Sequence, residues 1–228
     1  MAAAMGGKLP GPASGTAPAN AYTTESNPIV VIGEQYIAPY PVDLKIQHTV
    51  FTVAENNFDI TDVNDNPIFK VKNKLFSFPD RRVLLDAAGN PLVSLKQKVK
   101  ILSVHRRWRV FRGESDKSSD FLFSVRKSSL VHLKMRTKTT TTTTLDVFLA
   151  SNTSESLPDF KITEGWRDSS CTIFAGHAII AQMQRKQNVK SLVINADNYG
   201  ITAYPNVDYA FVVALVVILD EINRNSYD

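Results

Sequence analysis

The sequence predicts a mainly β protein: a closed antiparallel barrel of about 12 strands around a central hydrophobic C-terminal α-helix. Three observations predict this fold. Residues 209–219 carry no polar side chain except the Tyr209 hydroxyl, short runs of alternating apolar residues recur along the chain, and the turn sequence Asp-x-x-x-Asn-Pro occurs twice. A helix that is apolar on every side must be enclosed by protein. A sheet that closes on itself has no edges and leaves an interior that can hold such a helix.

The chain begins with a segment of low complexity. Residues 1–28 are mostly Ala, Gly, Pro, Ser and Thr, which predicts a disordered tail before a single domain at 29–228. The first residues lack the apolar stretch of a secretory signal, and Ala2 stands where myristoylation requires glycine. The single Cys171 has no partner for an internal disulfide, which favours a reducing compartment. We therefore expect a cytoplasmic protein, with the plasma membrane periphery or the nucleus as further locations.

About a dozen short runs have the period of two that is typical of strands. They lie at residues 44–46, 58–60, 68–71, 92–95, 108–110, 121–125, 131–135, 145–149, 171–173, 179–183, 192–194 and 201–203. Their number and spacing are typical of an all-β barrel or sandwich.

The repeated turn sequence supports this prediction. Asp62 to Pro67 and Asp86 to Pro91 share the pattern with an offset of 24 residues. Asn tolerates a positive φ, and the Pro that follows it has its own φ fixed by its ring. Each copy is therefore expected to form one hairpin turn.

The final apolar run predicts a helix at about residues 207–224. Asn206 is the expected N-cap, Asp208 an acid of the first turn, and Arg224 a cation at the C-terminal end. The Asp220-Glu221 pair is expected to end the buried part. The apolar stretch is shorter than the ~20 residues that cross a bilayer, so no transmembrane segment is predicted. The predicted contacts of this central helix with the barrel are made by Tyr209, Phe211, Val212, Leu215, Val216 and Leu219.

Motifs for catalysis are missing from the sequence. There is no nucleophile elbow, Walker loop, dinucleotide fingerprint or His-Glu-x-x-His motif. The four histidines lack metal-ligand spacing, and Cys171 at the start of an apolar run fits a buried, inert thiol. We therefore expect no catalytic residues, no metal and no cofactor.

Charge is distributed unevenly along the chain. Residues 70–138 contain 18 of the 26 Lys and Arg residues but 5 of the 22 acids, a net +13, which leaves −9 for the remainder. Such an asymmetry favours an anionic partner such as phospholipid or nucleic acid. The alternative is that these residues are ordinary solvated strand faces.

Alternating basic residues in this window would line one face of a strand. Each cation near a membrane contributes about 1 kcal/mol, so three or four suffice for weak, salt-sensitive recruitment. No recognition helix, zinc finger or RNA-binding aromatic motif is present, so anionic lipid head groups are favoured over nucleic acid. The candidate lipid-binding residues are Lys70, Lys72, Lys74, Lys96, Lys98, Lys100, Arg106, Arg107, Arg109, Lys134 and Arg136.

Several motifs resemble those of the plant LURP-one-related family, over about residues 30–224. The most specific is Tyr204-Pro-Asn-Val-Asp-Tyr-Ala-Phe211, which leads into the final helix. The others are Tyr40-Pro41, Phe58-x-Ile60-x-Asp62 with the Asn66 turn, Arg82-Val-Leu-Leu-Asp86, Trp108-x-Val110-Phe-Arg-Gly113 and Asp146-Val-Phe-Leu149. Asp65 departs from the glycine usual in the family's first turn.

This resemblance implies a 12-stranded barrel around a hydrophobic helix, similar to the tubby C-terminal domain and the phospholipid scramblases. It also implies a link to plant defence through the family's named member. Tubby-like domains bind phosphoinositides and can leave the membrane for the nucleus. None of tubby's lipid-binding residues matches a motif here, so none is carried over. The chain lacks a scramblase-like Cys cluster.

The leading hypothesis is a non-enzymatic, tubby-like protein that binds anionic phospholipid, such as phosphoinositide, peripherally and acts as a defence-related adaptor. The alternative is a protein-interaction module or membrane-tethered transcription regulator with protein partners. A scramblase or an enzyme with a small ligand at the barrel mouth is a third hypothesis.

Overall fold

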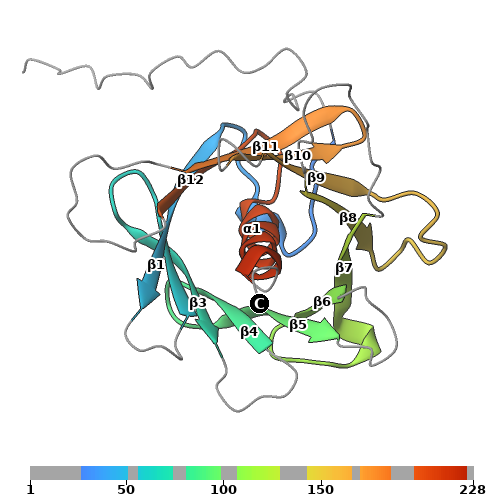
Figure 1. Ribbon diagram of the computed structural model, residues 1–228. Coiled ribbons are helices and arrows are strands. Elements are labelled where there is room, and N and C mark those ends of the chain that lie inside the picture. Colours follow the sequence, from blue (N-terminus) through green and yellow to red (C-terminus); the bar gives the residue numbers. More distant parts are fainter. Residues whose placement is uncertain are drawn as a thin grey trace, which may run out of the picture.

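A computed structural model describes residues 27–50, 56–73, 81–98, 107–128, 143–165, 170–185 and 198–224. Within these residues, twelve strands form a closed antiparallel barrel, and one α-helix runs through its middle (Figure 1). The strands are β1 (Val42–Val50), β2 (Asn56–Thr61), β3 (Pro67–Asn73), β4 (Arg81–Asp86), β5 (Pro91–Lys98), β6 (Arg107–Arg112), β7 (Phe121–Lys127), β8 (Thr143–Leu149), β9 (Phe160–Gly165), β10 (Ser170–Ala175), β11 (Ala178–Arg185) and β12 (Asn198–Ala203). The predicted fold class is confirmed.

Each strand pairs with its neighbours in sequence, and β1 pairs with β12 to close the ring. Because successive side chains of a strand point to opposite faces, each strand supplies one apolar set to the interior. In β3, Phe69 and Val71 are buried whereas Lys70 and Lys72 are exposed.

Two strands were not predicted. β4 is buried on both faces, so its sequence lacks the alternation that identifies a half-exposed strand. β9 alternates only at Phe160 and Ile162 before it reaches Thr, Glu and Gly. The predicted runs at 131–135 and 192–194 lie outside the described residues, as do residues 1–26 of the predicted tail.

The helix α1 (Tyr209–Arg224) is enclosed by the barrel. Every residue from Ala210 to Leu219 is at most 4% exposed, whereas Tyr209 at the entrance is partly exposed. The Phe211 ring packs against those of Phe123 and Phe160, with centroids 5.1 and 5.0 Å away.

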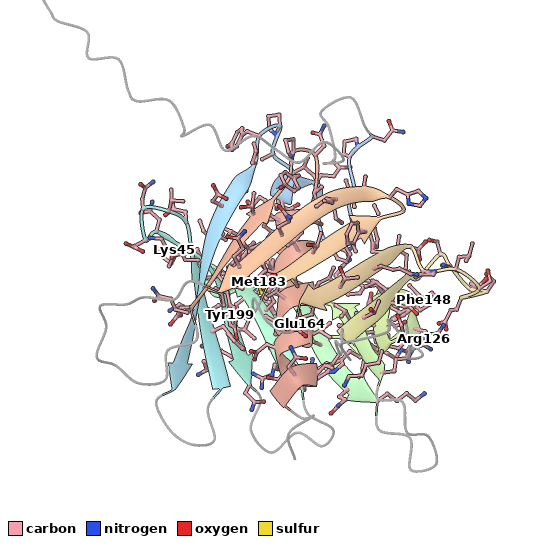
Figure 2. The ribbon with its side chains drawn as sticks, turned by 45° about the horizontal axis from the view of Figure 1, so that its top comes forward. Lys45, Arg126, Phe148, Glu164, Met183 and Tyr199 are labelled. Carbon is pink, nitrogen blue, oxygen red and sulfur yellow. The ribbon has the colours of Figure 1, made fainter. Side chains whose placement is uncertain are left out.

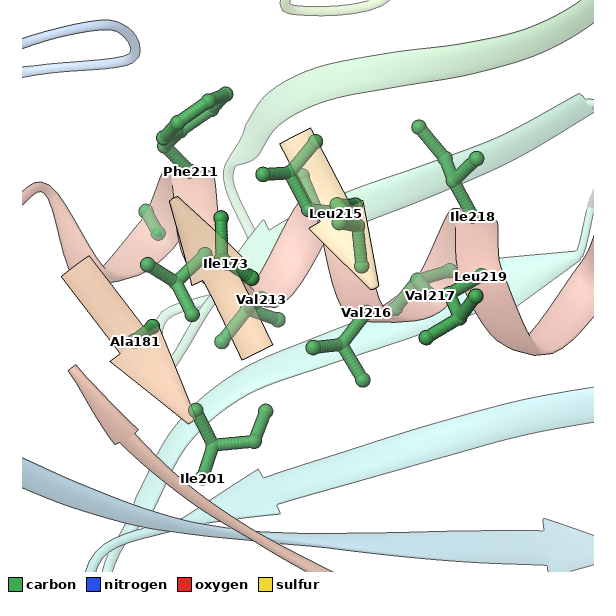
Figure 3. Packing of buried hydrophobic residues seen from close by; sticks show 14 of the residues in the cluster. Ile173, Ala181, Ile201, Phe211, Val213, Leu215, Val216, Val217, Ile218 and Leu219 are labelled. Carbon is green, nitrogen blue, oxygen red and sulfur yellow. The ribbon is translucent and has the colours of Figure 1, made fainter. Parts of the chain in front are cut away.

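The close view of the core shows the same enclosure from the strand side. Ile173, Ala181 and Ile201, from β10, β11 and β12, lie beside α1 (Figure 3). The predicted helix residues Val212, Leu215, Val216 and Leu219 are all buried here.

The helix begins later than predicted. Asn206 is not the N-cap, because it lies in a turn with φ 64° and the next residue, Val207, forms a parallel bridge with Ile29. Asp208 is the cap instead: its Oδ1 accepts the Phe211 N–H at 3.0 Å. The buried part of the helix also extends past Asp220, where it was predicted to end.

The Asp220-Glu221 pair does not end the buried part of the helix. Glu221 and Ile222 are each 6% exposed. Glu221 can be buried because Arg82 of β4 lies 2.5 Å from its carboxylate, inside the barrel.

The chain before β1 covers the end of the barrel where α1 begins. The second carboxylate oxygen of Asp208 accepts the backbone N–H groups of Val31, Ile32 and Gly33, at 3.2, 2.6 and 3.1 Å. The short 3-10 helix η1 (Glu34–Tyr36) follows. Tyr36 packs edge-on against Phe69 and Tyr209, with centroids 5.5 Å from each.

Both predicted hairpin turns are present, between β2 and β3 and between β4 and β5. The positive φ falls one residue earlier than predicted, at Asp65 and Gly89 rather than at the asparagines. Each asparagine instead donates its side-chain amide to the aspartate that opens the turn; the Asn66–Asp62 and Asn90–Asp86 distances are 2.8 and 2.9 Å.

Candidate anion-binding surface

Six basic side chains lie together on the outer face of β4 to β7. They form two rows across the strands, because their residues are paired in register. The first row is Arg81, Lys96 and Arg109, and the second is Lys98, Arg107 and Arg126. All six point outward, since the residues between them along each strand face the interior. We call these six residues the cationic face.

Loop acids compensate part of this charge. Like charges placed directly opposite on neighbouring strands destabilise a sheet. The β6–β7 loop (113–120) brings Asp116 to 3.2 Å from the Lys96 ammonium, and Arg81 donates to the carbonyl of Glu114. The β8–β9 loop (150–159) brings Glu155 against the second row.

Aromatic rings support the guanidinium groups of the cationic face. Arg109 lies over the rings of Phe111 and Phe121, at 5.0 and 4.6 Å from their centroids. Arg126 lies 4.4 Å from the Phe148 centroid, and Figure 2 shows these two side chains on one flank of the barrel. A guanidinium stacked on a ring keeps its N–H edge available for an oxyanion.

The structure brings together four of the predicted lipid-binding residues, namely Lys96, Lys98, Arg107 and Arg109. Lys70 and Lys72 are exposed on β3, opposite Leu85 and Val83 of β4, and so lie outside the two rows. Lys70 is also 4.0 Å from Asp59. The remaining five, Lys74, Lys100, Arg106, Lys134 and Arg136, lie outside the described residues.

A model of the LURP-one-related family matches residues 42–220 of this chain. The chain belongs to that family. Protein LURP-one-related 15 of Arabidopsis thaliana is 45% identical over 212 residues, which cover 92% of this chain and 93% of the relative. Protein LURP-one-related 10 of the same plant is 43% identical over 198 residues, covering 86% and 97%.

A crystal structure of an Arabidopsis thaliana protein is similar to this LURP-one-related chain, with a TM-score of 0.62 and 42% sequence identity. The match covers 85% of this chain and 98% of that one. The names of these relatives state family membership and no enzymatic activity.

Sequence reasoning missed two cations and two acids of this surface. Arg126 could have been found, because it continues the predicted alternation at 121–125. Arg81 could not, since it lies in the unpredicted strand β4. The contributions of Asp116 and Glu155 depend on where two loops fold, which no local pattern encodes.

A second polar group lies where α1 ends. Besides the Arg82–Glu221 ion pair, Asn223 donates to Glu164 at 2.8 Å. Burial raises the pKa of Glu164, and burial likewise raises the pKa of the Cys171 thiol to about 12. Cys171 is buried, as the sequence predicted, and an un-ionised buried thiol is a poor nucleophile.

The described residues contain neither a cluster that could hold a metal ion nor a helix that could span a membrane. No group of three or more His, Cys, Asp or Glu residues is placed there to hold a metal ion. No helix among them is long and apolar enough to cross a bilayer.

Proposed function

We propose that this LURP-one-related protein binds anionic phospholipid head groups at the membrane surface through its cationic face, without catalysing a reaction. The observation that carries the proposal is the pair of cross-strand rows, which concentrates six cations on three pairs of neighbouring strands. Two loop carboxylates, Asp116 and Glu155, compensate only part of this charge.

The expected affinity is modest and sensitive to salt. The outer face of a closed barrel is convex, so only part of the cationic face can touch a flat bilayer at once. Three or four cations near the membrane contribute roughly 3–4 kcal/mol. Salt screens exposed charges over about 8 Å at ~0.15 M ionic strength, so binding should weaken as salt is added.

Vesicle flotation tests the proposal. The wild-type protein should float with phosphatidylcholine vesicles that contain phosphoinositide and remain behind with pure phosphatidylcholine at ~0.15 M salt. Equal recovery with the two kinds of vesicle would overturn the proposal.

A matched pair of charge reversals tests the surface. Lys98→Glu should weaken binding by roughly thirtyfold, since it changes the local charge by two units at about 1 kcal/mol each. Lys45→Glu is the control, because Lys45 lies on the opposite flank of the barrel from Arg126 in Figure 2. Equal losses in the two variants would show that net charge alone matters.

We extend the proposal to a tubby-like, defence-related adaptor role, which family membership supports. A fluorescent fusion should then be enriched at the plasma membrane, and Lys98→Glu should move it to the cytoplasm or nucleus. Unchanged enrichment of that variant would point to protein partners instead.

A further inference from the structure

One carboxylate occupies the second row of the cationic face. The Glu155 carboxylate contacts Arg107 directly and lies 3.5 Å from the Arg126 guanidinium, both through Oε2. Arg107 and Arg126 are paired residues of β6 and β7, so their side chains converge on one place. The pair of arginines is therefore arranged to hold an oxyanion, and a side chain of the same protein now fills that position.

The β8–β9 loop holds Glu155 there in a strained conformation. Glu155 has φ 48°, which is uncommon for a residue with a side chain. Its N–H donates to Asn152 at 3.1 Å, and the Asn152 amide donates in turn to the Leu157 carbonyl and to Asp159. Backbone strain of this kind concentrates at ligand-binding sites and switches.

The arginines offer more donors than one carboxylate can accept. Each guanidinium has five N–H donors, and the buried Nε of Arg107 has no hydrogen-bond partner among the described residues. A phosphomonoester brings three oxygens and about 1.5–2 negative charges, and arginine pairs with it in a bidentate manner. It matches this pair of arginines better than a carboxylate does.

The surrounding charges are mixed. Lys98 lies opposite Arg107 in the register, and Asp146 lies opposite Arg126, with Lys161 beyond it. The two lysines are exposed. Counted over the described residues named here, the neighbourhood contains four cations and two acids, and this set remains positive with Glu155 in place.

We propose that Arg107 and Arg126 form a site for the phosphomonoester head group of a membrane lipid, and that Glu155 is an internal competitor that this phosphate displaces. The inference rests on the proposed lipid binding and assigns it a position and a regulation. Because a ligand binds only the open fraction of the site, the tethered carboxylate lowers the apparent affinity by that fraction.

Two variants that each remove one carboxylate, and therefore have the same net charge, distinguish binding at this site from a general effect of net charge. Glu155→Gln removes the internal competitor. Asp116→Asn removes the acid paired with Lys96 in the first row and is the control. Each is measured by flotation with phosphatidylcholine vesicles that contain phosphatidic acid, a phosphomonoester, or phosphatidylglycerol, a phosphodiester.

Glu155→Gln should bind phosphatidic acid vesicles about fivefold more tightly than wild type, with a smaller gain on phosphatidylglycerol. Asp116→Asn should change both by less than about twofold, since the Asp116 side chain is 77% exposed and its charge is screened by solvent. Adding Arg107→Gln to Glu155→Gln should abolish the gain. Equal gains in both single variants, or a gain that survives Arg107→Gln, would overturn the inference.

Calorimetry with inorganic pyrophosphate separates this inference from the proposed function. If wild type shows no preference for anionic vesicles but Glu155→Gln alone binds pyrophosphate, the phosphate site with its internal competitor is supported, whereas membrane binding and a lipid head group as the ligand are both wrong. If wild type prefers anionic vesicles and Glu155→Gln matches it on every ligand, the membrane function stands and the internal competitor is wrong.

Discussion

Asp208 joins two distant parts of the chain through one side chain. One carboxylate oxygen caps α1, and the other accepts three N–H groups of the segment before β1. The residue is fully buried. Burial raises the pKa of this carboxyl, and the hydrogen bonds from Phe211, Ile32, Gly33 and Val31 act in the opposite direction.

Replacing Asp208 by Asn should destabilise the protein by about 2–3 kcal/mol, because an amide places donors against N–H donors and loses charge-assisted hydrogen bonds. Urea unfolding measures the loss. Asp65→Asn is the control; it removes an exposed ion pair with Lys45 and should cost less than about 1 kcal/mol. Similar costs for both substitutions would contradict the anchoring role.

Asp62 and Asp86 make stability depend on pH. The side-chain amides of Asn66 and Asn90 are the main cause that lowers the pKa of each carboxyl below the ordinary 3.8. Since the folded-state pKa is the lower one, the unfolded chain binds more protons in the window between the two values. The stabilisation is present above pH 3.8 and is lost as the pH falls through the folded-state pKa.

The double variant Asp62→Asn/Asp86→Asn should therefore lose stability less steeply than wild type on acidification below about pH 4. Urea unfolding at a series of pH values measures the two slopes. Parallel slopes would show that these turns contribute nothing to acid sensitivity.

At the scale of elements, the two hairpin turns share a hydrogen-bond pattern but differ at the residue with positive φ. Asp65 has φ 65° in the first turn and Gly89 has φ 90° in the second. A Cβ added at Gly89 would meet no atom within 4 Å. Any penalty for a side chain there comes from the backbone conformation alone.

Gly89→Ala should cost about 1–2 kcal/mol, and Gly89→Asn less, because Asn tolerates left-handed backbone. Thermal unfolding of the two variants measures the difference. Equal losses of stability in Gly89→Ala and Gly89→Asn would contradict the assignment of the cost to the positive φ.

Across the whole molecule, polar contacts hold α1 at both ends inside an apolar barrel. Asp208 fixes its start, and the Arg82–Glu221 ion pair fixes its last turns to β4. Both side chains of the ion pair are nearly inaccessible, at 4% and 7% exposure. These polar contacts fix the two ends of the helix along the barrel axis, and apolar contacts fill the length between them.

Removing one member of this pair should be worse than removing both. Glu221→Leu takes away the carboxylate that compensates Arg82 inside the barrel and should cost about 3–5 kcal/mol. The double variant Arg82→Met/Glu221→Leu should cost less than Glu221→Leu alone. A double-mutant cycle by urea unfolding tests this order, and additive losses would contradict the coupling.

Local sequence determined the architecture. The stretch 209–219 is apolar on every side, so enclosure was the only arrangement available to it, and most strands showed their period of two. β4 was not predicted, because a strand that is buried on both faces has no alternation of apolar and polar residues. The second role of Asp208 could not be predicted because its partners, Val31 to Gly33, lie about 175 residues away in sequence.

Only the tertiary structure decided which charges meet. The sequence indicated an excess of cations in residues 70–138, and it favoured Lys96, Lys98, Arg107 and Arg109 as outward residues. It contained no information on cross-strand register with Arg81 and Arg126, or on the loop that brings Glu155 to them. Periodicity is a property of neighbours along the chain, whereas cross-strand pairing and the return of a loop arise only when distant segments pack together.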